Sequence, residues 1–174
     1  MTLIDTEYDA MPDVAALTLD RRTLLITGGL MALVGLAGCG SLPTGSGAGA
    51  SKAASGIVAG IRRTNGLGSL SPDSQLEQAA LQQAGYMAGA GRMAHTAGRG
   101  KDFASRVKGN GIEGAAAENI AEGRMDLQRL FDMWMHSAPH RRNMLDPRFT
   151  RYGLAYVSDG NNGQWRYWCL ILGK

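Results

Sequence analysis

The hydrophobic pattern of this 174-residue chain changes its period near residue 150. Before that point, apolar side chains recur at the three- to four-residue spacing of an amphipathic helix. After it, "YGLAYVS" and "QWRYWCLIL" flank the turn sequence "DGNNG", which predicts two strands joined as an antiparallel hairpin. Helices followed by a hairpin predict an α+β domain in which helices pack on a small antiparallel sheet.

Two strong helices are predicted in the middle of the chain. The sequence Ser-Pro-Asp at 71–73 favours a helix start, and small apolar residues then follow at helical spacing to about Ala90. Asp126 is expected to cap a second helix, whose core-facing stripe ends at Trp134. Pro139 prevents a smooth continuation of that helix.

The segment between these two helices gives weaker signals. A short helix is expected over residues 102–108, with Phe103 and Val107 on one face. Residues 109–124 are rich in Gly and Ala, and they predict a loop with a short ordered core at residues 117–121.

Residues 1–38 are predicted to be an export signal. An arginine pair at 21–22 precedes an apolar run over 24–38, which is too short for the roughly 20 helical residues that cross a bilayer. The run ends in Leu-Ala-Gly before Cys39, which resembles the bacterial lipobox that is cut before a lipidated cysteine. The arginine pair resembles a twin-arginine signal, and the general secretory route is the alternative.

The mature chain would then begin at a lipidated Cys39. Residues 39–56 consist mainly of Gly, Ser and Ala, and they are expected to be a flexible tether for a domain over residues 57–174. This organisation predicts a bacterial cell-envelope protein that is anchored in a membrane and faces the periplasm or the exterior. Gly40 stands where inner-membrane lipoproteins often carry Asp, which favours the outer membrane.

Charge and cysteine content narrow the class of partner. Residues 1–38 contain five acidic and two basic residues, so their removal raises the formal net charge from +3 to +6. This moderate charge favours weak attraction to anionic lipids, and the absence of a dense Lys/Arg patch in the sequence argues against nucleic-acid binding. With Cys39 lipidated, Cys169 has no partner for a disulfide, so we expect a monomeric domain held by its core, with Cys169 as a buried inert thiol.

Three residues stand out as candidates for chemistry: His95, Glu118 and His140. Two imidazoles and a carboxylate can bind a zinc-like ion with one position open to water, although each residue alone is more often a cap or a structural hydrogen-bonding group. Ser137 precedes His140 by three residues and is either a nucleophile or, more simply, the cap of the turn that follows. His136 is expected to be exposed.

The order of several motifs adds a family resemblance. "AENIAEG" around Glu118 and "MHSAPHRRNM" around His140, after "HT" at His95, resemble the CAP superfamily of cysteine-rich secretory, antigen 5 and plant pathogenesis-related proteins. The resemblance is strongest to the bacterial, cysteine-poor branch with an SCP-like domain, and it covers about residues 57–174. It implies an α-β-α sandwich with a central antiparallel sheet.

The same resemblance implies a cleft lined by two histidines and two acidic residues. His95 and His140 match the histidines, Glu118 matches one acid, and Ser137 stands in the place of the other. We therefore expect a membrane-tethered module, rather than a classical enzyme, that binds a small molecule, lipid or envelope component, with zinc or another divalent ion at His95, Glu118 and His140. The alternatives are a metal- or Ser/His-dependent hydrolase and a purely structural hydrogen-bond network.

Overall fold

A computed structural model describes residues 46–174, and the predicted export signal and Cys39 lie outside this range. In chain order the elements are β1 (Gly47–Gly49), α2 (Ser51–Thr64), β2 (Ser71–Pro72), α3 (Ser74–Ala90), α4 (Phe103–Gly109), β3 (Ala116–Gly123), α5 (Leu127–His136), α6 (Ala138–Met144), β4 (Arg151–Asp159) and β5 (Asn162–Gly173). None of the helices in this range is both long and apolar enough to span a membrane.

One sheet organises the domain. Its strands follow the order β1-β4-β5-β3, with antiparallel neighbours throughout, and the short β2 adds a parallel pairing to β4. The predicted hairpin is confirmed as β4 and β5, which pair from Arg151 with Gly173 to Asp159 with Asn162.

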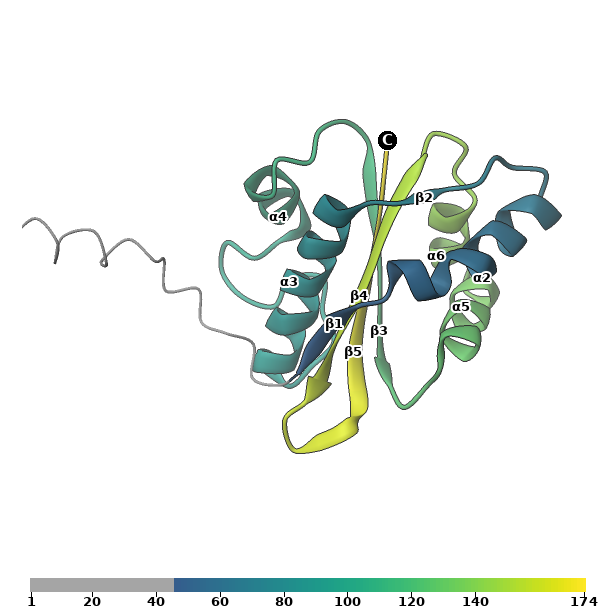
Figure 1. The fold of residues 1–174 in the computed structure, drawn as a ribbon. Helices are drawn as coiled ribbons and strands as arrows, with labels where there is room; N and C mark the ends of the chain where they lie inside the picture. Colours follow the sequence, from purple (N-terminus) through teal and green to yellow (C-terminus); the bar gives the residue numbers. More distant parts are fainter. Residues whose placement is uncertain (1–45) are drawn as a thin grey trace, which may run out of the picture. The chain divides into compact units, whose positions relative to one another are not determined.

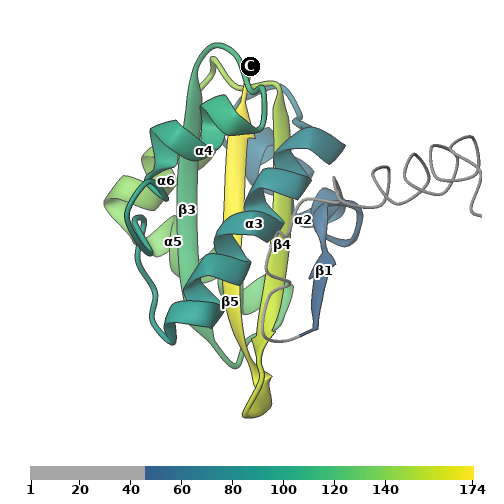
Figure 2. The same cartoon turned by 90° about the vertical axis from the view of Figure 1, so that its left-hand side faces the viewer.

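Helices cover both faces of the sheet (Figures 1 and 2): α3 and α4 lie on one side, and α2, α5 and α6 lie on the other. The alternation of side chains along β5 explains this layering. Trp168, Leu170 and Leu172 pack into the core on the α5 side, whereas Cys169 and Ile171 pack into the core on the α3 side. The predicted α+β fold with helices on an antiparallel sheet is therefore confirmed.

The two strong helices form where the sequence predicts them. Asp73 and Asp126 are their N-caps, and each carboxylate accepts a hydrogen bond from a backbone N–H three residues later, at 2.9 Å and 2.8 Å. Ser71 and Pro72 are not part of the first helix, contrary to the predicted start, because the backbone N–H of Ser71 donates to Thr150 O and holds this segment extended against β4.

Residues 116–123 form the strand β3, which contains the predicted ordered core at 117–121 and is longer than that prediction, so the predicted loop is wrong for the remaining residues of the strand. All eight residues of β3 pair with β5, from Ala116 with Gly173 to Gly123 with Arg166. Ala and Gly have low intrinsic strand propensity, and the pairing with a neighbouring strand overrides that preference.

The predicted tether over 39–56 is also corrected, because residues 47–49 are a strand and α2 begins at Ser51. Glu77 of α3 holds this segment, since its carboxylate accepts from the backbone N–H of Ser51 at 3.0 Å. A Cβ at Gly49 would lie 2.1 Å from the Glu77 carboxylate, so a larger residue there would displace that carboxylate. Any tether is therefore confined to residues before Gly47.

Gly153 of β4 lies directly beneath the first turn of α3, and a Cβ there would lie 2.0 Å from the backbone nitrogen of Glu77. We expect Gly153→Ala to lower the free energy of unfolding by about 3 kcal/mol, because helix and strand backbones must separate. Urea denaturation measures this loss. Gly163→Ala, at the second residue of β5 with open space around it, is the matched control and should change stability by less than about 0.5 kcal/mol. Equal effects would contradict the packing argument.

Candidate functional site

The candidate site lies along β3, which is the last strand in the sheet order and pairs on one side only. Successive side chains of a strand point to opposite faces of the sheet, so Glu118 and Asn119 are directed into different helical layers. Glu118 contacts Arg106 of α4, and Asn119 contacts α6. The Glu-Asn pair therefore connects both layers at one edge of the sheet.

Glu118 is a buried carboxylate with both oxygens engaged. Its side chain is 2% exposed. Oε1 lies 2.8 Å from His95 Nδ1, and Oε2 accepts a hydrogen bond from Arg106 Nη2. Cys169 lies on the neighbouring strand β5, and its thiol is 3.5 Å from Glu118 Oε2. Burial, and then the charge of Glu118, raises the pKa of the Cys169 thiol, which agrees with the prediction of an inert buried cysteine.

Arg106 is a site residue that the sequence analysis missed. It is 3% exposed, and Nη1 donates to the backbone carbonyl of His95 at 3.0 Å. The residue lies three positions after Phe103 and one before Val107, on the face of α4 that the spacing predicts to be apolar. An arginine within an apolar stripe is the signal that could have identified it, because a buried cation needs an anionic partner.

His140 and its helix are fixed to β3 by amide side chains. Asn119 Nδ2 donates to the backbone carbonyl of His140 at 3.2 Å, and Asn143 Nδ2 donates to Asn119 Oδ1 at 2.9 Å. Trp134 adds a hydrogen bond from Nε1 to Ile120 O at 3.2 Å, and its ring lies 6.5 Å from the His140 ring between centroids. Sequence reasoning selected His140 but missed both asparagines.

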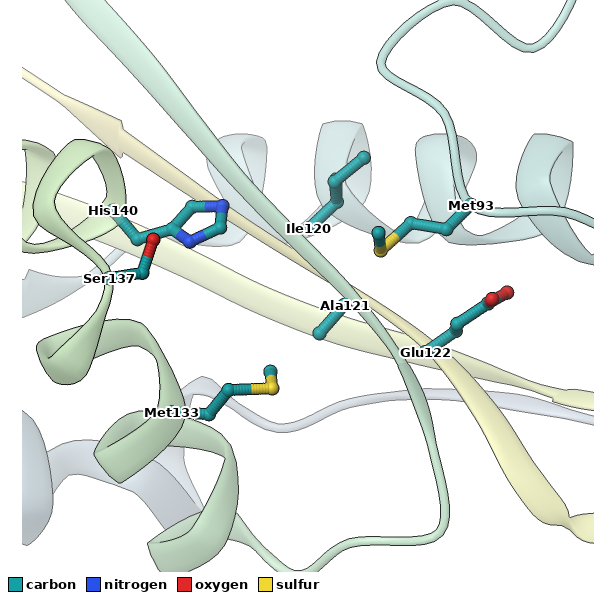
Figure 3. A pocket seen from close by; sticks show the side chains of 7 residues that line it. All are labelled: Met93, Ile120, Ala121, Glu122, Met133, Ser137 and His140. Atoms are coloured by element: carbon teal, nitrogen blue, oxygen red, sulfur yellow. The ribbon is translucent and has the colours of Figure 1, made fainter.

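A hollow of about 190 Å³ lies beside His140 (Figure 3). Met93, Met133, Ile120 and Ala121 supply its apolar lining, and Glu122, Ser137 and His140 also line it. Met93 is 46% and Met133 is 37% exposed, and both thioethers turn toward the hollow from opposite sides. This region therefore offers accessible apolar surface next to an imidazole.

Ser137 is the N-cap residue of α6 by position, but its side chain makes no capping hydrogen bond, contrary to the predicted role. Its hydroxyl instead lies at the hollow beside His140. Among the described residues, no hydrogen bond joins Ser137 to His140, although a serine nucleophile needs such a contact with its base. His136 is exposed, as predicted, and its Nδ1 lies 2.7 Å from Asp132 O.

The predicted zinc ligands fit the geometry only in part. Within residues 46–174, no three His, Cys, Asp or Glu side chains are grouped as a metal site. Glu118 does not fit as a ligand, because its oxygens are buried and face Arg106 and His95. His95 does fit as a ligand, since its side chain is 57% exposed and its Nδ1 partner is a carboxylate, the usual arrangement behind a metal-binding histidine.

Comparison with known proteins finds a family match that covers most of the described residues. A model of the family described as "Cysteine-rich secretory protein family" matches residues 56–172. The uncharacterised protein YkwD of Bacillus subtilis is 44% identical over 46 residues, which are 26% of this chain and 18% of that protein. The aligned segment thus spans under a fifth of this relative's length.

Two solved structures are similar in fold. An outer surface protein of Borrelia burgdorferi matches with a TM-score of 0.64 and 20% identity, over 75% of this chain and 98% of that one. An extracellular protein containing an SCP domain from Bacillus anthracis matches with a TM-score of 0.63 and 22% identity, over 71% of this chain and 40% of that one. At these identities the likeness shows the fold.

The environment of His140 predicts a pH dependence of stability. Burial, and then the charge of His95, lowers the pKa of His140 below the usual value of 6.5. The unfolded chain therefore binds a proton at His140 at a higher pH than the folded protein does, so stability should fall as the pH is lowered from about 7 toward 5. Urea unfolding across this range measures the effect.

His140→Gln should remove part of this pH dependence, whereas His136→Gln, an exposed histidine four residues earlier, should leave it in place. Identical pH profiles for wild type and His140→Gln would contradict the assignment.

Proposed function

The chain belongs to the cysteine-rich secretory protein (CAP) family, and we propose that it is an exported, membrane-tethered member of the cysteine-poor bacterial branch that binds a small apolar ligand. The ligand is a lipid or a lipid-like component of the cell envelope. Export is supported by the predicted signal over residues 1–38 and by relatives described as an outer surface protein and an extracellular protein.

The apolar hollow beside His140 is the observation that carries this proposal. Exposed methionines are flexible and polarisable, and they adapt to apolar partners of varied shape. The volume of about 190 Å³ is below the roughly 300–1,000 Å³ of sites that enclose a drug-sized molecule. The hollow therefore suits one acyl chain, or one part of a larger lipid, rather than a whole bulky ligand.

Polar groups at the hollow would orient such a ligand. Because its pKa is lowered, His140 is neutral at pH 7 and can accept or donate a hydrogen bond. Ser137 adds a hydroxyl that makes no capping bond. A divalent cation would be held by His95 and His140, and when bound it would attract an anionic or carbonyl oxygen of the ligand. We do not propose the hydrolase alternative, because no observation of this geometry favours it.

The proposed membrane anchor would place the hollow near its source of ligand. Gly47, where the strand β1 begins, is only eight positions after Cys39 in the sequence. A fully extended chain of that length spans at most about 28 Å. A lipid on Cys39 would therefore keep the domain within about one bilayer thickness of the membrane surface.

Ligand binding is tested with a fluorescent dodecanoyl probe. We expect Met133→Lys to weaken binding at least tenfold, because an ammonium group would enter the apolar hollow. Gln128→Lys adds the same charge to an exposed position of α5 and should bind as wild type does. If the wild-type domain does not bind the probe, or both variants bind equally, the apolar-ligand proposal fails.

Anchoring is tested by cell fractionation and mass analysis of the mature protein. We expect wild type in the membrane fraction with acyl mass on Cys39, and Cys39→Ala without acyl mass and released from that fraction after signal cleavage. Cys169→Ala is the matched control and should remain lipidated, since this cysteine is buried in the core. A soluble wild-type protein would overturn the anchor.

A further inference from the structure

We propose that Arg106 is a positioning residue that selects the tautomer of His95, by fixing Glu118 as its hydrogen-bond acceptor. The geometry on which this rests is a chain of three side chains from Arg106 through Glu118 to His95. The proposal deepens the proposed ligand site, since His95 is one of its two imidazoles, but its main test needs no ligand.

The ion pair with Arg106 fixes the charge of Glu118. Arg106 is protonated at any accessible pH, and its guanidinium forms an ion pair with Glu118 in which both side chains are 2% exposed. A buried carboxylate in contact with a fixed cation is stabilised in its ionised form. An ionised carboxylate can only accept hydrogen bonds.

The hydrogen bonds of Glu118 determine which ring nitrogen of His95 carries the proton. Arg106 occupies Oε2 of Glu118, and Oε1 faces His95 Nδ1 at 2.8 Å. Since Oε1 has no proton to give, Nδ1 of His95 must be the donor. In the neutral imidazole Nε2 then carries the lone pair. The exposed ring therefore presents an acceptor, or a metal ligand, rather than an N–H group.

Arg106 also holds the backbone of His95. Nη1 of Arg106 donates to the His95 carbonyl oxygen at 3.0 Å and also to the carbonyl of Lys101. One guanidinium thus holds the main chain of His95 directly and its ring through Glu118. Both ends of the residue are fixed to α4, although His95 itself lies in the loop between α3 and α4.

Stability alone does not account for an arginine at this position. Arg106 Nε is buried without a hydrogen-bond partner, which is unfavourable. Buried ion pairs are often no more stabilising than apolar side chains of similar size, and the neighbours Phe103 and Val107 pack against the apolar core on this face. The guanidinium is explained by what it does to Glu118 and His95.

Glu118→Gln provides the decisive test, because an amide has one acceptor and one donor end. If Arg106 fixes the orientation of the side chain at position 118, its guanidinium donates a hydrogen bond to the Gln oxygen. The amide NH₂ then faces His95 Nδ1. Nδ1 must become the acceptor, so the proton moves to Nε2. We expect long-range ¹H–¹⁵N spectra at about pH 8 to show the Nδ1–H tautomer of His95 in wild type and the Nε2–H tautomer in Glu118→Gln.

The double variant Arg106→Met with Glu118→Gln tests the cause of this inversion. Without the guanidinium, the Gln oxygen is free to face His95, and the Nδ1–H tautomer should return. An unchanged tautomer in Glu118→Gln overturns the proposal, as does an inverted tautomer that persists in the double variant. If the double variant does not fold, an unchanged tautomer in Glu118→Gln still overturns the proposal.

Arg62→Met is the matched control. Arg62 is also buried, at 2% exposure, but it donates to the carbonyls of Gly68, Met144, Asp146 and Phe149 and not to Glu118. Its loss should lower the melting temperature and leave the His95 tautomer unchanged. A shifted tautomer in Arg62→Met would mean that general loosening moves the ring, and would also overturn the proposal.

Zinc titration gives a second readout. We expect Glu118→Gln to bind Zn²⁺ about 10- to 100-fold more weakly than wild type, because Nε2 then carries a proton and the histidine loses its ionised partner. If the wild-type domain binds no Zn²⁺, the metal part of the proposed function fails, while the tautomer experiment still decides the role of Arg106.

Discussion

The pairing of β3 with β5 is the constraint on which the rest of the site depends. This ladder fixes which residues of an Ala- and Gly-rich segment face each helical layer, and a slip by one residue would exchange them. In the observed register Glu118 meets Arg106 and His95, and Asn119 meets α6. Two consecutive residues of the strand therefore direct a charged network to one face of the sheet and an amide network to the other.

These two networks hold the two histidines of the candidate site in different ways. The Glu118 network is buried and ionic, and it holds an exposed histidine whose other ring nitrogen is free. The Asn119 network is neutral, and it holds the backbone of α6 so that His140 lies at the apolar hollow. Because both oxygens of Glu118 are buried against Arg106 and His95, this carboxylate is placed to hold His95.

Local signals in the sequence account for the elements that were predicted well. The capping aspartates of α3 and α5, and the alternation that marks the β4–β5 hairpin, depend on near neighbours in the chain. The strand conformation of β3 was not predicted because its residues have little strand propensity and are recruited by a partner about fifty residues away. The N-terminal strand was missed for the same reason, since its partner β4 is far away in the sequence. Arg106 was missed although its position within an apolar stripe is a local signal.

The side chains that fasten α5 and α6 to β3 have a further consequence for the edge of the sheet. Two outward carbonyls of this last strand, those of Glu118 and Ile120, receive hydrogen bonds from Asn143 and Trp134. A strand with two of its acceptors already satisfied is a poorer template for another chain. The residues that hold the helices beside the hollow thus also protect the domain against edge-to-edge aggregation, and their loss would leave these carbonyls open to pairing with another chain.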